Sequence, residues 1–289
     1  MLTIGLYLLG QKGLNVLENL YIKYSNEILF VVVGKDENVQ SDYSKEIIEF
    51  CNNNRLKYYK RDEINLPFTT IQFAIGWKWL IPDSQNLIVL HDSLLPKYRG
   101  YNPLVTALLN GDEEVGVTAI KANKEYDRGN IVGQIKLKIN YPIKIKYVID
   151  EISDLYTELV LTITSKYIES DIKEVIQNES EASYSIWRDE DDFIIDWNNE
   201  STFIHRFINS VGYPYKGAKT KFENRFIRIL DSEIMTDLNI VNRTPGKIFS
   251  IEDGLPIIIC GQGLLKIISA VDEDSKQSIL FKKLRMKFI

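Results

Sequence analysis

VLHDSLLPKYRG, residues 89–100, ends an apolar run with a histidine and then turns through a segment that carries two cationic side chains. The residues LIVL before His91 are apolar at consecutive positions, which is typical of a strand covered on both faces. Such strands belong to mostly parallel sheets flanked by helices, and open sheets of this kind bind ligands beyond the carboxyl ends of their strands. The stretch therefore predicts an open α/β sheet with a ligand site where Pro96 and Gly100 turn the chain.

The segments on either side of this stretch extend the same pattern. Apolar runs alternate with amphipathic stretches, so we expect a mostly parallel, Rossmann-like open sheet followed by a small β-rich domain. Gly10 and Gly13 lie at the first strand-to-helix turn, but the three-glycine fingerprint of a nucleotide loop is incomplete and a plain tight turn is expected. The expected strands of the first domain lie at 3–10, 27–34, 56–60, 70–77, 86–93, 114–122 and 130–139, and its helices at 13–25, 41–54, 103–111 and 145–170.

The pattern of expected helices and strands changes after the polar patch QNESEAS, residues 177–183. Beyond it come an amphipathic helix over 201–210 and then short strands separated by Gly, Pro, Asn and Asp, which is typical of a small β-barrel or hairpin module. We therefore expect a catalytic domain over 1–183, followed by a helix and a small β-barrel-like domain over 184–289.

The composition favours a globular, cytoplasmic protein. Of the 289 residues, 45% are hydrophobic and 26% are charged, which argues against disorder. The net charge of −5 weighs against a nucleic-acid partner, and no apolar run approaches the roughly 20 residues that span a membrane. The N-terminal MLTIGLYLLG lacks the basic start and cleavage site of a signal peptide. Cys51 and Cys260 fit neither a disulfide framework nor a metal-ligand pair, so we expect free, buried thiols.

His91 is one of only two histidines in the chain, and its place at a strand end beside a turn makes it a candidate catalyst. A structural histidine is the alternative. His91, Asp92 and Ser93 do not predict a hydrolase triad, because consecutive strand residues point to opposite faces. No second histidine or cysteine stands at ligand spacing, so no metal site is expected. Asp127, in the loop EYDRGN, is either a solvated turn residue or the carboxylate that orients His91 and favours its protonated form.

Three segments, HDSLLPKYRG, ALLNGDEEVGVTAI and EYDRGNIVGQ, together resemble the 10-formyltetrahydrofolate-dependent formyltransferase family in order and spacing. The later segments RDEDDFIIDWNNE, GYPYKGA and GKIFSIEDGLPIIICGQGLLKI resemble the second domain that methionyl-tRNA formyltransferases share with nucleotide-sugar formyltransferases. The resemblance covers nearly the whole chain. It implies that His91 and Asp127 are catalytic and that 10-formyltetrahydrofolate is the co-substrate.

The family's Asn-x-His pattern is broken here, because Val89 stands at the asparagine position and valine has no hydrogen-bond donor for an oxyanion. Asn86 does not simply replace it, since it faces the other side of the strand from His91 unless a bulge intervenes. Three explanations compete. In two of them the enzyme is active: protonated His91 stabilises the oxyanion, or another donor takes over, from Asn102, Asn123, Asn130 or a backbone N–H. In the third the protein is inactive; we favour an active enzyme because the rest of the site is present.

The resemblance also implies where the two substrates bind. The pterin is expected against the backbone of WKWLI and of the loop NKEYD, because backbone amides and carbonyls match its donors and acceptors. The two tryptophans of WKWLI either pack in the core or bind a flat ligand. The cations after His91 either bind a diphosphate or belong to a solvated loop. The expected folate-binding residues are Trp77, Lys78, Trp79, Leu80, Ile81, Asn123, Lys124, Glu125 and Tyr126, and the expected substrate-binding residues are Lys97, Tyr98, Arg99 and Asn102.

One function is favoured, with two alternatives. We expect N-formyl transfer from 10-formyltetrahydrofolate to the amine of a UDP- or dTDP-linked amino sugar, without a nucleic-acid or membrane partner, and the family suggests a homodimer. A methionyl-tRNA formyltransferase is the first alternative. Against it stand the acidic balance, the lack of an obvious basic insertion and Asp92, where the tRNA enzymes usually show proline. The second is an inactive relative that binds folate or nucleotide.

Overall fold

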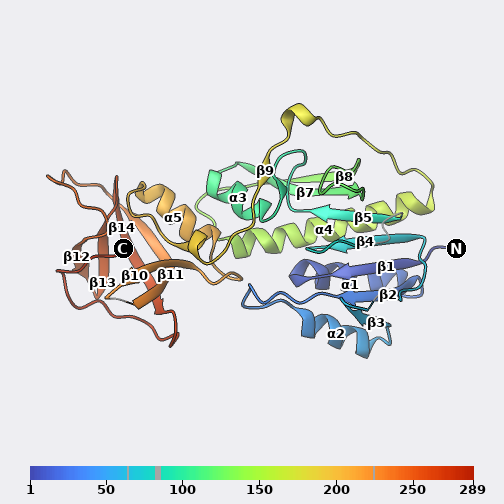
Figure 1. Ribbon diagram of the computed structural model, residues 1–289, viewed down its shortest axis with the longest axis horizontal. Helices are drawn as coiled ribbons and strands as arrows, with labels where there is room; N and C mark the ends of the chain where they lie inside the picture. Colours follow the sequence, from blue (N-terminus) through green and yellow to red (C-terminus); the bar gives the residue numbers. More distant parts are fainter. Residues whose placement is uncertain (64, 82–85, 224) are drawn as a thin grey trace. The chain divides into compact units, whose positions relative to one another are not determined.

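The computed structural model describes residues 1–63, 65–81, 86–223 and 225–289, and the chain forms two compact units (Figure 1). Unit 1 holds Met1–Ala107, Asp112–Ile139 and Tyr147–Trp187. Unit 2 holds Leu108–Gly111, Asn140–Lys146 and Arg188–Ile289. Along the chain, the last change from unit 1 to unit 2 falls between Trp187 and Arg188, whereas the boundary was expected near residue 183.

Unit 1 is built on a seven-stranded sheet of order β3-β2-β1-β4-β5-β7-β8. The strands from β3 to β5 pair in parallel, whereas β7 and β8 are antiparallel to their neighbours. This arrangement confirms the mostly parallel open sheet that the apolar runs predict. The strands are β1 (Ile4–Leu8), β2 (Ile28–Val33), β3 (Tyr58–Lys60), β4 (Ile71–Ile75), β5 (Leu87–His91), β7 (Glu114–Lys121) and β8 (Ile131–Lys138).

Helices cover this sheet because its central strands are buried throughout and almost wholly apolar. All five residues of β1 and of β4 are buried. Helix α1 (Gly10–Tyr24) contacts β1, α2 (Ser44–Asn53) contacts β2, and Figure 1 shows the long α4 (Ile145–Ile168) running alongside β4 and β5. Burying each large aliphatic side chain of such a helix stabilises the unit by about 1.5–3 kcal/mol relative to leaving it exposed. In α4 the buried residues follow helical spacing, as Val148, Ile152 and Val160 do.

A short parallel bridge joins two distant segments of unit 1. Strand β6 (Arg99–Gly100) pairs with β9 (Tyr184–Ser185), so the chain that follows the 3-10 turn η1 (Glu179–Glu181) returns to the turn after β5. Gly100 has a φ of 99°, and a Cβ there would lie 2.4 Å from the Ser185 carbonyl oxygen, so only glycine fits. The sequence patterns did not predict this bridge, because two residues on each side are too few to show a period. Helix α3 (Pro103–Asn110) follows β6 and begins at a proline.

Unit 2 contains a five-stranded antiparallel sheet of order β10-β11-β14-β13-β12 and the helix α5 (Ser201–Ser210). Its core includes alternate residues of two central strands, Ile227 with Ile229 and Leu265 with Ile267, which are fully buried. This sheet confirms the small β-rich C-terminal domain. The 3-10 turn η2 (Asp191–Phe193) precedes the strands β10 (Ala218–Phe222), β11 (Arg225–Met235), β12 (Ile248–Glu252), β13 (Leu255–Ile259) and β14 (Leu264–Asp272).

The remaining expectations concern thiols, membranes and metals. Cys51 and Cys260 are free and buried, as expected, and burial raises the pKa of each thiol to about 12. Among the described residues, no helix is both long and apolar enough to cross a bilayer. Within those same residues, no three or more His, Cys, Asp or Glu side chains gather closely enough to hold a metal ion.

Both cysteines should therefore resist thiol reagents in the native protein. With a pKa near 12, only about one thiol in ten thousand is ionised at pH 8, and the thiolate is the reactive form. Ellman's reagent is expected to detect no thiol in buffer and both thiols after guanidinium chloride is added. Rapid release of thionitrobenzoate before denaturation would contradict the burial of these side chains.

Candidate active site

His91 ends β5 at the carboxyl edge of the parallel strands, where ligands bind in open α/β sheets. Strand alternation places its side chain on the same face as Leu87 and Val89. The residue is only 8% exposed. A buried imidazole needs partners for its two nitrogens, so the contacts of Nδ1 and Nε2 determine what His91 can do.

One ring nitrogen of His91 is fixed by the backbone. Nε2 lies 2.8 Å from the carbonyl oxygen of Tyr98, and because a carbonyl accepts but never donates, Nε2 carries the proton. Nδ1 is therefore the lone-pair nitrogen of the neutral ring. Tyr98 has a left-handed φ of 59°, and the hydroxyl of Ser185 also donates to its carbonyl oxygen at 3.3 Å.

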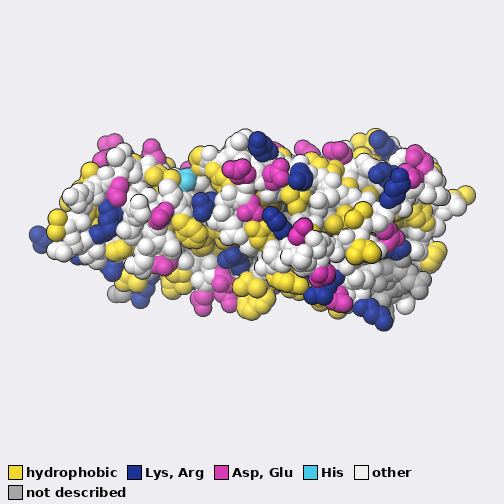
Figure 2. Space-filling model, turned by 90° about the horizontal axis from the view of Figure 1, so that it is seen from above, with side chains coloured by type: hydrophobic (Ala, Val, Ile, Leu, Met, Phe, Trp, Pro, Cys, Tyr) yellow, Lys and Arg dark blue, Asp and Glu magenta, His cyan; other side chains and the backbone are white. Residues whose placement is uncertain are grey.

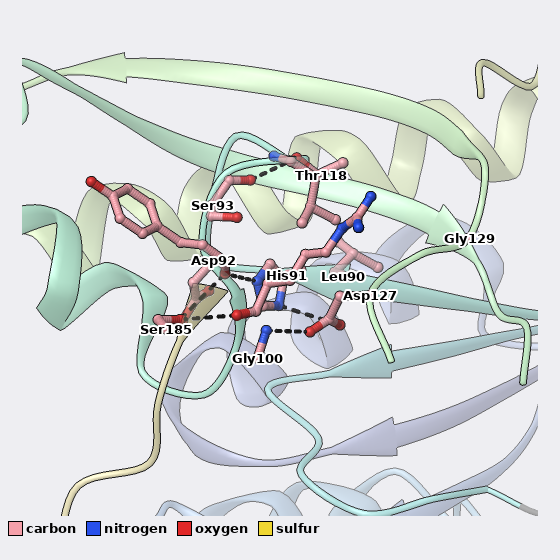
Figure 3. A network of polar contacts seen from close by, with 12 residues as sticks. Leu90, His91, Asp92, Ser93, Gly100, Thr118, Asp127, Gly129 and Ser185 are labelled. Carbon is pink, nitrogen blue, oxygen red and sulfur yellow. Dashed lines mark hydrogen bonds and ion pairs between the residues drawn. The ribbon is translucent and has the colours of Figure 1, made fainter. Parts of the chain in front are cut away.

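The carboxylate of Asp127 faces the other ring nitrogen (Figure 3). Asp127 lies in the loop between β7 and β8, and its Oδ1 is 3.6 Å from Nδ1 of His91. This distance is too long for a hydrogen bond, but it allows a strong charge interaction once Nδ1 gains a proton. Oδ2 of Asp127 accepts a hydrogen bond from the N–H of Gly100 at 2.7 Å. The structure thus brings together the two side chains that the sequence marks as a proton-transfer pair.

The turn after His91 is anchored by a mostly buried ion pair. Lys12, in the first turn of α1, pairs with Asp92. The hydroxyl of Tyr156 lies 2.5 Å from Oδ1 of Asp92 and 3.2 Å from the carbonyl oxygen of Leu90. Burial alone raises the pKa of a carboxyl, but the Lys12 ammonium and the Tyr156 hydroxyl outweigh it and lower the pKa of Asp92. Asp92 therefore stays ionised and ties the turn to two helices.

Three of the predicted substrate-binding residues surround this turn. Lys97 is exposed. The hydroxyl of Tyr98 donates a hydrogen bond to Asp112 at 2.9 Å. Asn102 is half-buried, has a left-handed φ of 51° and immediately precedes α3. Of the three, Lys97 presents a cation to solvent, and the substrate roles of all three stay predictions.

Arg99, the fourth, is committed to protein contacts. It is only 1% exposed, and its guanidinium donates hydrogen bonds of 2.7–3.1 Å to Gln177 and to both carboxylate oxygens of Glu179. These contacts occupy the planar guanidinium that was expected to bind a diphosphate. The structure therefore gives no support to a substrate role for Arg99.

The segment Trp77–Ile81 follows β4 and presents aromatic rings. The Trp77 ring meets Tyr7 edge-on with centroids 5.4 Å apart and Trp79 with centroids 5.0 Å apart. Within the described part of the chain, the buried indole N–H of Trp77 finds no acceptor, a deficit that costs about 1–3 kcal/mol. Lys78 forms an ion pair with Asp36; Leu80 is exposed, and Ile81 packs against the apolar cluster that contains Tyr7.

The second predicted folate segment is the exposed loop before Asp127. Asn123, Lys124, Glu125 and Tyr126 are all exposed. Oδ1 of Asn123 accepts a hydrogen bond from the backbone N–H of Glu125 at 2.9 Å, which shapes the loop. The folate-binding roles of this loop and of Trp77–Ile81 stay predictions.

The position of the family asparagine is filled by an apolar contact. Val89 packs against the cluster that contains Tyr7, Ala74 and Leu87. Two of the amides considered as substitutes point to other partners: Nδ2 of Asn86 donates to the Thr69 carbonyl at 3.3 Å, and Nδ2 of Asn130 donates to Glu174 at 2.8 Å. His91 itself, Asn102, Asn123 and backbone N–H groups remain as candidate oxyanion donors.

Comparison with known proteins decides the family. Residues 78–163 match the formyl transferase family, and residues 188–282 match the family described as formyl transferase, C-terminal domain. The chain belongs to the formyl transferases. These matches confirm the resemblance that HDSLLPKYRG and the segments after it suggest.

One curated relative of this formyl transferase is the methionyl-tRNA formyltransferase of Streptococcus agalactiae serotype III (strain NEM316), which is 36% identical over 140 residues. That match covers 48% of this chain and 45% of the relative, so it spans less than half the length of the streptococcal enzyme.

Two solved structures share the fold of this formyl transferase. The sugar 3N-formyl transferase WlaRD, solved in the presence of dTDP and 5-N-formyl-THF, has a TM-score of 0.70 and 21% identity, and the match covers 92% of this chain and 97% of that one. An N-formyltransferase from Helicobacter canadensis, in complex with folinic acid and dTDP-3-aminofucose, has a TM-score of 0.68 and 20% identity over 92% of this chain and 99% of that one. At such identities these likenesses establish the fold alone.

Several residues of the site were not predicted from the sequence. Gln177 and Ser185 lie in a stretch that showed only polarity and a change of pattern, and Lys12 lies in a glycine turn that was interpreted as structural. The short stretch SYSI around Ser185 gave no signal of pairing with β6. A signal existed for Lys12, because a cation in the turn after β1 faces the same sheet edge as the acid after β5.

Removing the Lys12 ammonium should destabilise the fold at neutral pH. In a Lys12→Met variant Asp92 is left as a mostly buried, unpaired carboxylate, which costs about 3 kcal/mol of unfolding free energy. The deficit should shrink as the pH falls, because burial without the cation raises the pKa of the variant's Asp92 above its usual value, so this carboxyl takes up a proton first. Wild type loses its ion pair only below the unfolded pKa of about 3.9. Urea unfolding at pH 7 and at low pH measures both effects.

The matched control is Lys45→Met, the same change at an exposed lysine of α2. It should change the unfolding free energy by no more than about 0.5 kcal/mol. Equal stability of Lys12→Met and Lys45→Met at pH 7 would show that the Asp92 pair does not anchor the turn.

Proposed function

We propose that this chain is an N-formyltransferase that moves the formyl group of 10-formyltetrahydrofolate to the amine of a nucleotide-linked amino sugar. The observation that carries the proposal is the orientation of His91, whose Nδ1 lone pair faces Asp127 while Nε2–H is held by the Tyr98 carbonyl. The formyl transferase family supports the reaction type, and the two solved sugar formyltransferases support the substrate class.

His91 and Asp127 suit the proton traffic of formyl transfer. An amine that attacks a formyl carbon must lose a proton, and Nδ1 of His91 accepts it as general base. The resulting imidazolium lies between the Tyr98 carbonyl and the Asp127 carboxylate, both of which stabilise its positive charge. The folate nitrogen that gives up the formyl group must gain a proton, which the same imidazolium supplies. The proton taken from the amine therefore ends on the folate, and the site returns to its starting state.

The same pair accounts for the missing asparagine. Val89 cannot donate to the formyl oxygen, but once Nδ1 of His91 has taken up the amine proton, its N–H can donate to the oxyanion of the tetrahedral intermediate. Loss of one oxyanion donor costs about 100- to 1000-fold in turnover in other enzymes, and a charged donor can recover much of that.

The segments around the site fit a pterin. The buried indole N–H of Trp77 has no acceptor among the described residues, and it lies in an aromatic cluster with Tyr7 and Trp79. A flat heteroaromatic ring with exposed nitrogen and oxygen acceptors satisfies such a donor. Backbone groups of Trp77–Ile81 and of residues 123–127 are the proposed partners of the rest of the ring, and 10-formyltetrahydrofolate supplies the formyl group when it binds there.

A methionyl-tRNA formyltransferase is the second candidate, because the streptococcal relative is 36% identical over 140 residues. The charge of the chain favours a nucleotide-linked amino sugar over tRNA as the substrate. The chain has a net charge of −5, and Figure 2 shows acidic and basic side chains interspersed over the face that it draws. A tRNA partner requires many cations free to meet phosphates, and the buried Arg99 is engaged by Gln177 and Glu179. We place the exposed Lys97 at the diphosphate of the sugar nucleotide.

A substrate panel tests the proposal. UDP- and dTDP-linked amino sugars and charged initiator tRNA are each incubated with 10-formyltetrahydrofolate, and release of tetrahydrofolate is followed together with mass spectrometry of the acceptor. At least one amino sugar should gain a formyl group, whereas its N-acetylated analogue, which has no free amine, should not react. Formylation of the tRNA alone would transfer the assignment to the second candidate, and no turnover with tight folate binding would indicate an inactive relative.

Replacing the imidazole of His91 should remove most of the activity. A His91→Gln variant keeps a side chain of similar shape but has no group that accepts and returns a proton, so kcat should fall by at least about 100-fold. The chain offers a matched control in its other histidine, because His205 lies in unit 2, where its ring nitrogens hydrogen-bond to Ser232 and Asn209. His205→Gln should keep kcat within about three-fold of wild type. Full turnover by His91→Gln would eliminate His91 as the proton carrier.

A further inference from the structure

We propose that Gln177, held by the buried guanidinium of Arg99, is a positioning residue that fixes the Asp127 carboxylate against His91. This inference rests on the proposed function, since it assigns Asp127 a partner role in formyl transfer. It also replaces the diphosphate role that the sequence suggested for Arg99.

The amide of Gln177 is fully used in one orientation. Gln177 is only 7% exposed, and its Nε2 donates hydrogen bonds to the carbonyl oxygens of Asp127 at 2.7 Å and Gly129 at 2.8 Å. Its Oε1 accepts from Nε of Arg99 at 3.1 Å and from Nη2 at 2.8 Å. Arginine offers only donors and backbone carbonyls only accept, so the reversed amide would face repulsion on both sides. Arg99 therefore sets the direction in which Gln177 donates.

Asp127 is held through its backbone carbonyl and through its side chain, and both contacts lead back to the consecutive residues Arg99 and Gly100. Its backbone carbonyl is bound by Gln177, which Arg99 orients, and its Oδ2 is bound by the N–H of Gly100. These contacts close a ring that runs from Arg99 through Gln177 and Asp127 to Gly100 and back along the chain. The remaining oxygen, Oδ1, is the one that faces Nδ1 of His91.

The tie acts on a strained residue that ends an exposed stretch of loop. Asp127 has a left-handed φ of 56°, which is unfavourable for a residue with a side chain, and residues 123–126 before it are exposed. Without the Gln177 donors, relaxation of φ would move the carboxylate away from the ring. A displacement of about 1 Å at a reacting centre can cost about 100-fold in rate.

Two substitutions separate the parts of this arrangement. Gln177→Met has a similar length but neither donates nor accepts, so the loop loses its tie and Arg99 loses an acceptor. Gln177→Glu keeps an acceptor for Arg99 and loses both donors to the loop. If the donors position Asp127, kcat should fall by about 10- to 100-fold in both variants, and KM for the sugar nucleotide should change less than about three-fold.

The matched control is Asn178→Asp, the same amide-to-carboxylate change one residue along the chain. The side chain of Asn178 is exposed and, in the part of the chain that the structure describes, hydrogen-bonds to Ser180 and Glu181. Oδ1 of an aspartate accepts from Ser180 equally well. Wild-type kcat is expected for this variant. Wild-type kcat in Gln177→Glu would overturn the proposal, because the donors to Asp127 and Gly129 would then be dispensable.

A second measurement distinguishes positioning from a general loss of structure and does not need turnover. The chain has only two histidines, so the ring nitrogens of His91 can be assigned in long-range 1H–15N spectra by comparison with His91→Gln. In Gln177→Met and Gln177→Glu the Nδ1 resonance of His91 should shift toward its position in Asp127→Asn, while Asn178→Asp should overlay with wild type. A fall in kcat with an unmoved Nδ1 resonance would overturn the proposal.

The two proposals fail in different ways. If the wild-type protein formylates no acceptor on the panel, the proposed function is wrong, and the Nδ1 resonance alone then decides whether Gln177 positions Asp127. If the wild type is active and the Gln177 variants match it, the function stands and the positioning role is wrong.

Discussion

The hydrogen bond from Nε2–H of His91 to the carbonyl oxygen of Tyr98 decides what the rest of the site can do. It leaves Nδ1 as the only ring nitrogen that can accept a proton, so the proposed proton transfer takes place on the Nδ1 side of the ring. The bond joins two residues that lie seven positions apart, starting at the end of β5, so it depends on local geometry. The carboxylate opposite Nδ1 comes from a different part of the chain, in the loop between β7 and β8. Placing it requires contacts that the turn cannot provide.

Two cations, the mostly buried Lys12 and the buried Arg99, provide such contacts around His91. Lys12 holds Asp92 in the turn, and Arg99 orients the amide that binds the Asp127 loop. A buried ion pair adds little net stability compared with apolar packing, but removing one partner leaves a charge without compensation. Such pairs therefore resist rearrangement. The site keeps its geometry because alternative positions of these side chains are costly, even though the contacts contribute little to folding.

The parts of the fold that follow a local period were predicted from the sequence. The apolar runs marked the parallel strands, and the position of His91 at the end of one run followed from them. Asp127 was found because a turn aspartate matched a family segment. Gln177 was missed because its partners lie 48 and 78 residues away, and nothing in a polar patch indicates which amide will be buried. The pairing of β6 with β9 and the contact of Lys12 with Asp92 likewise join distant segments, and only tertiary structure reveals them.

The bridge between β6 and β9 means that the catalytic unit does not end where its large sheet and α4 end. All seven strands and the helices that cover them are complete by Ile168, yet Gln177 and Ser185 lie beyond that point. A chain cut soon after α4 would keep every strand of this sheet but would lose Gln177 and Ser185, which contact the carbonyl oxygens of Asp127 and Tyr98. The length of polypeptide that builds the sheet and the length that completes the proposed site are thus different.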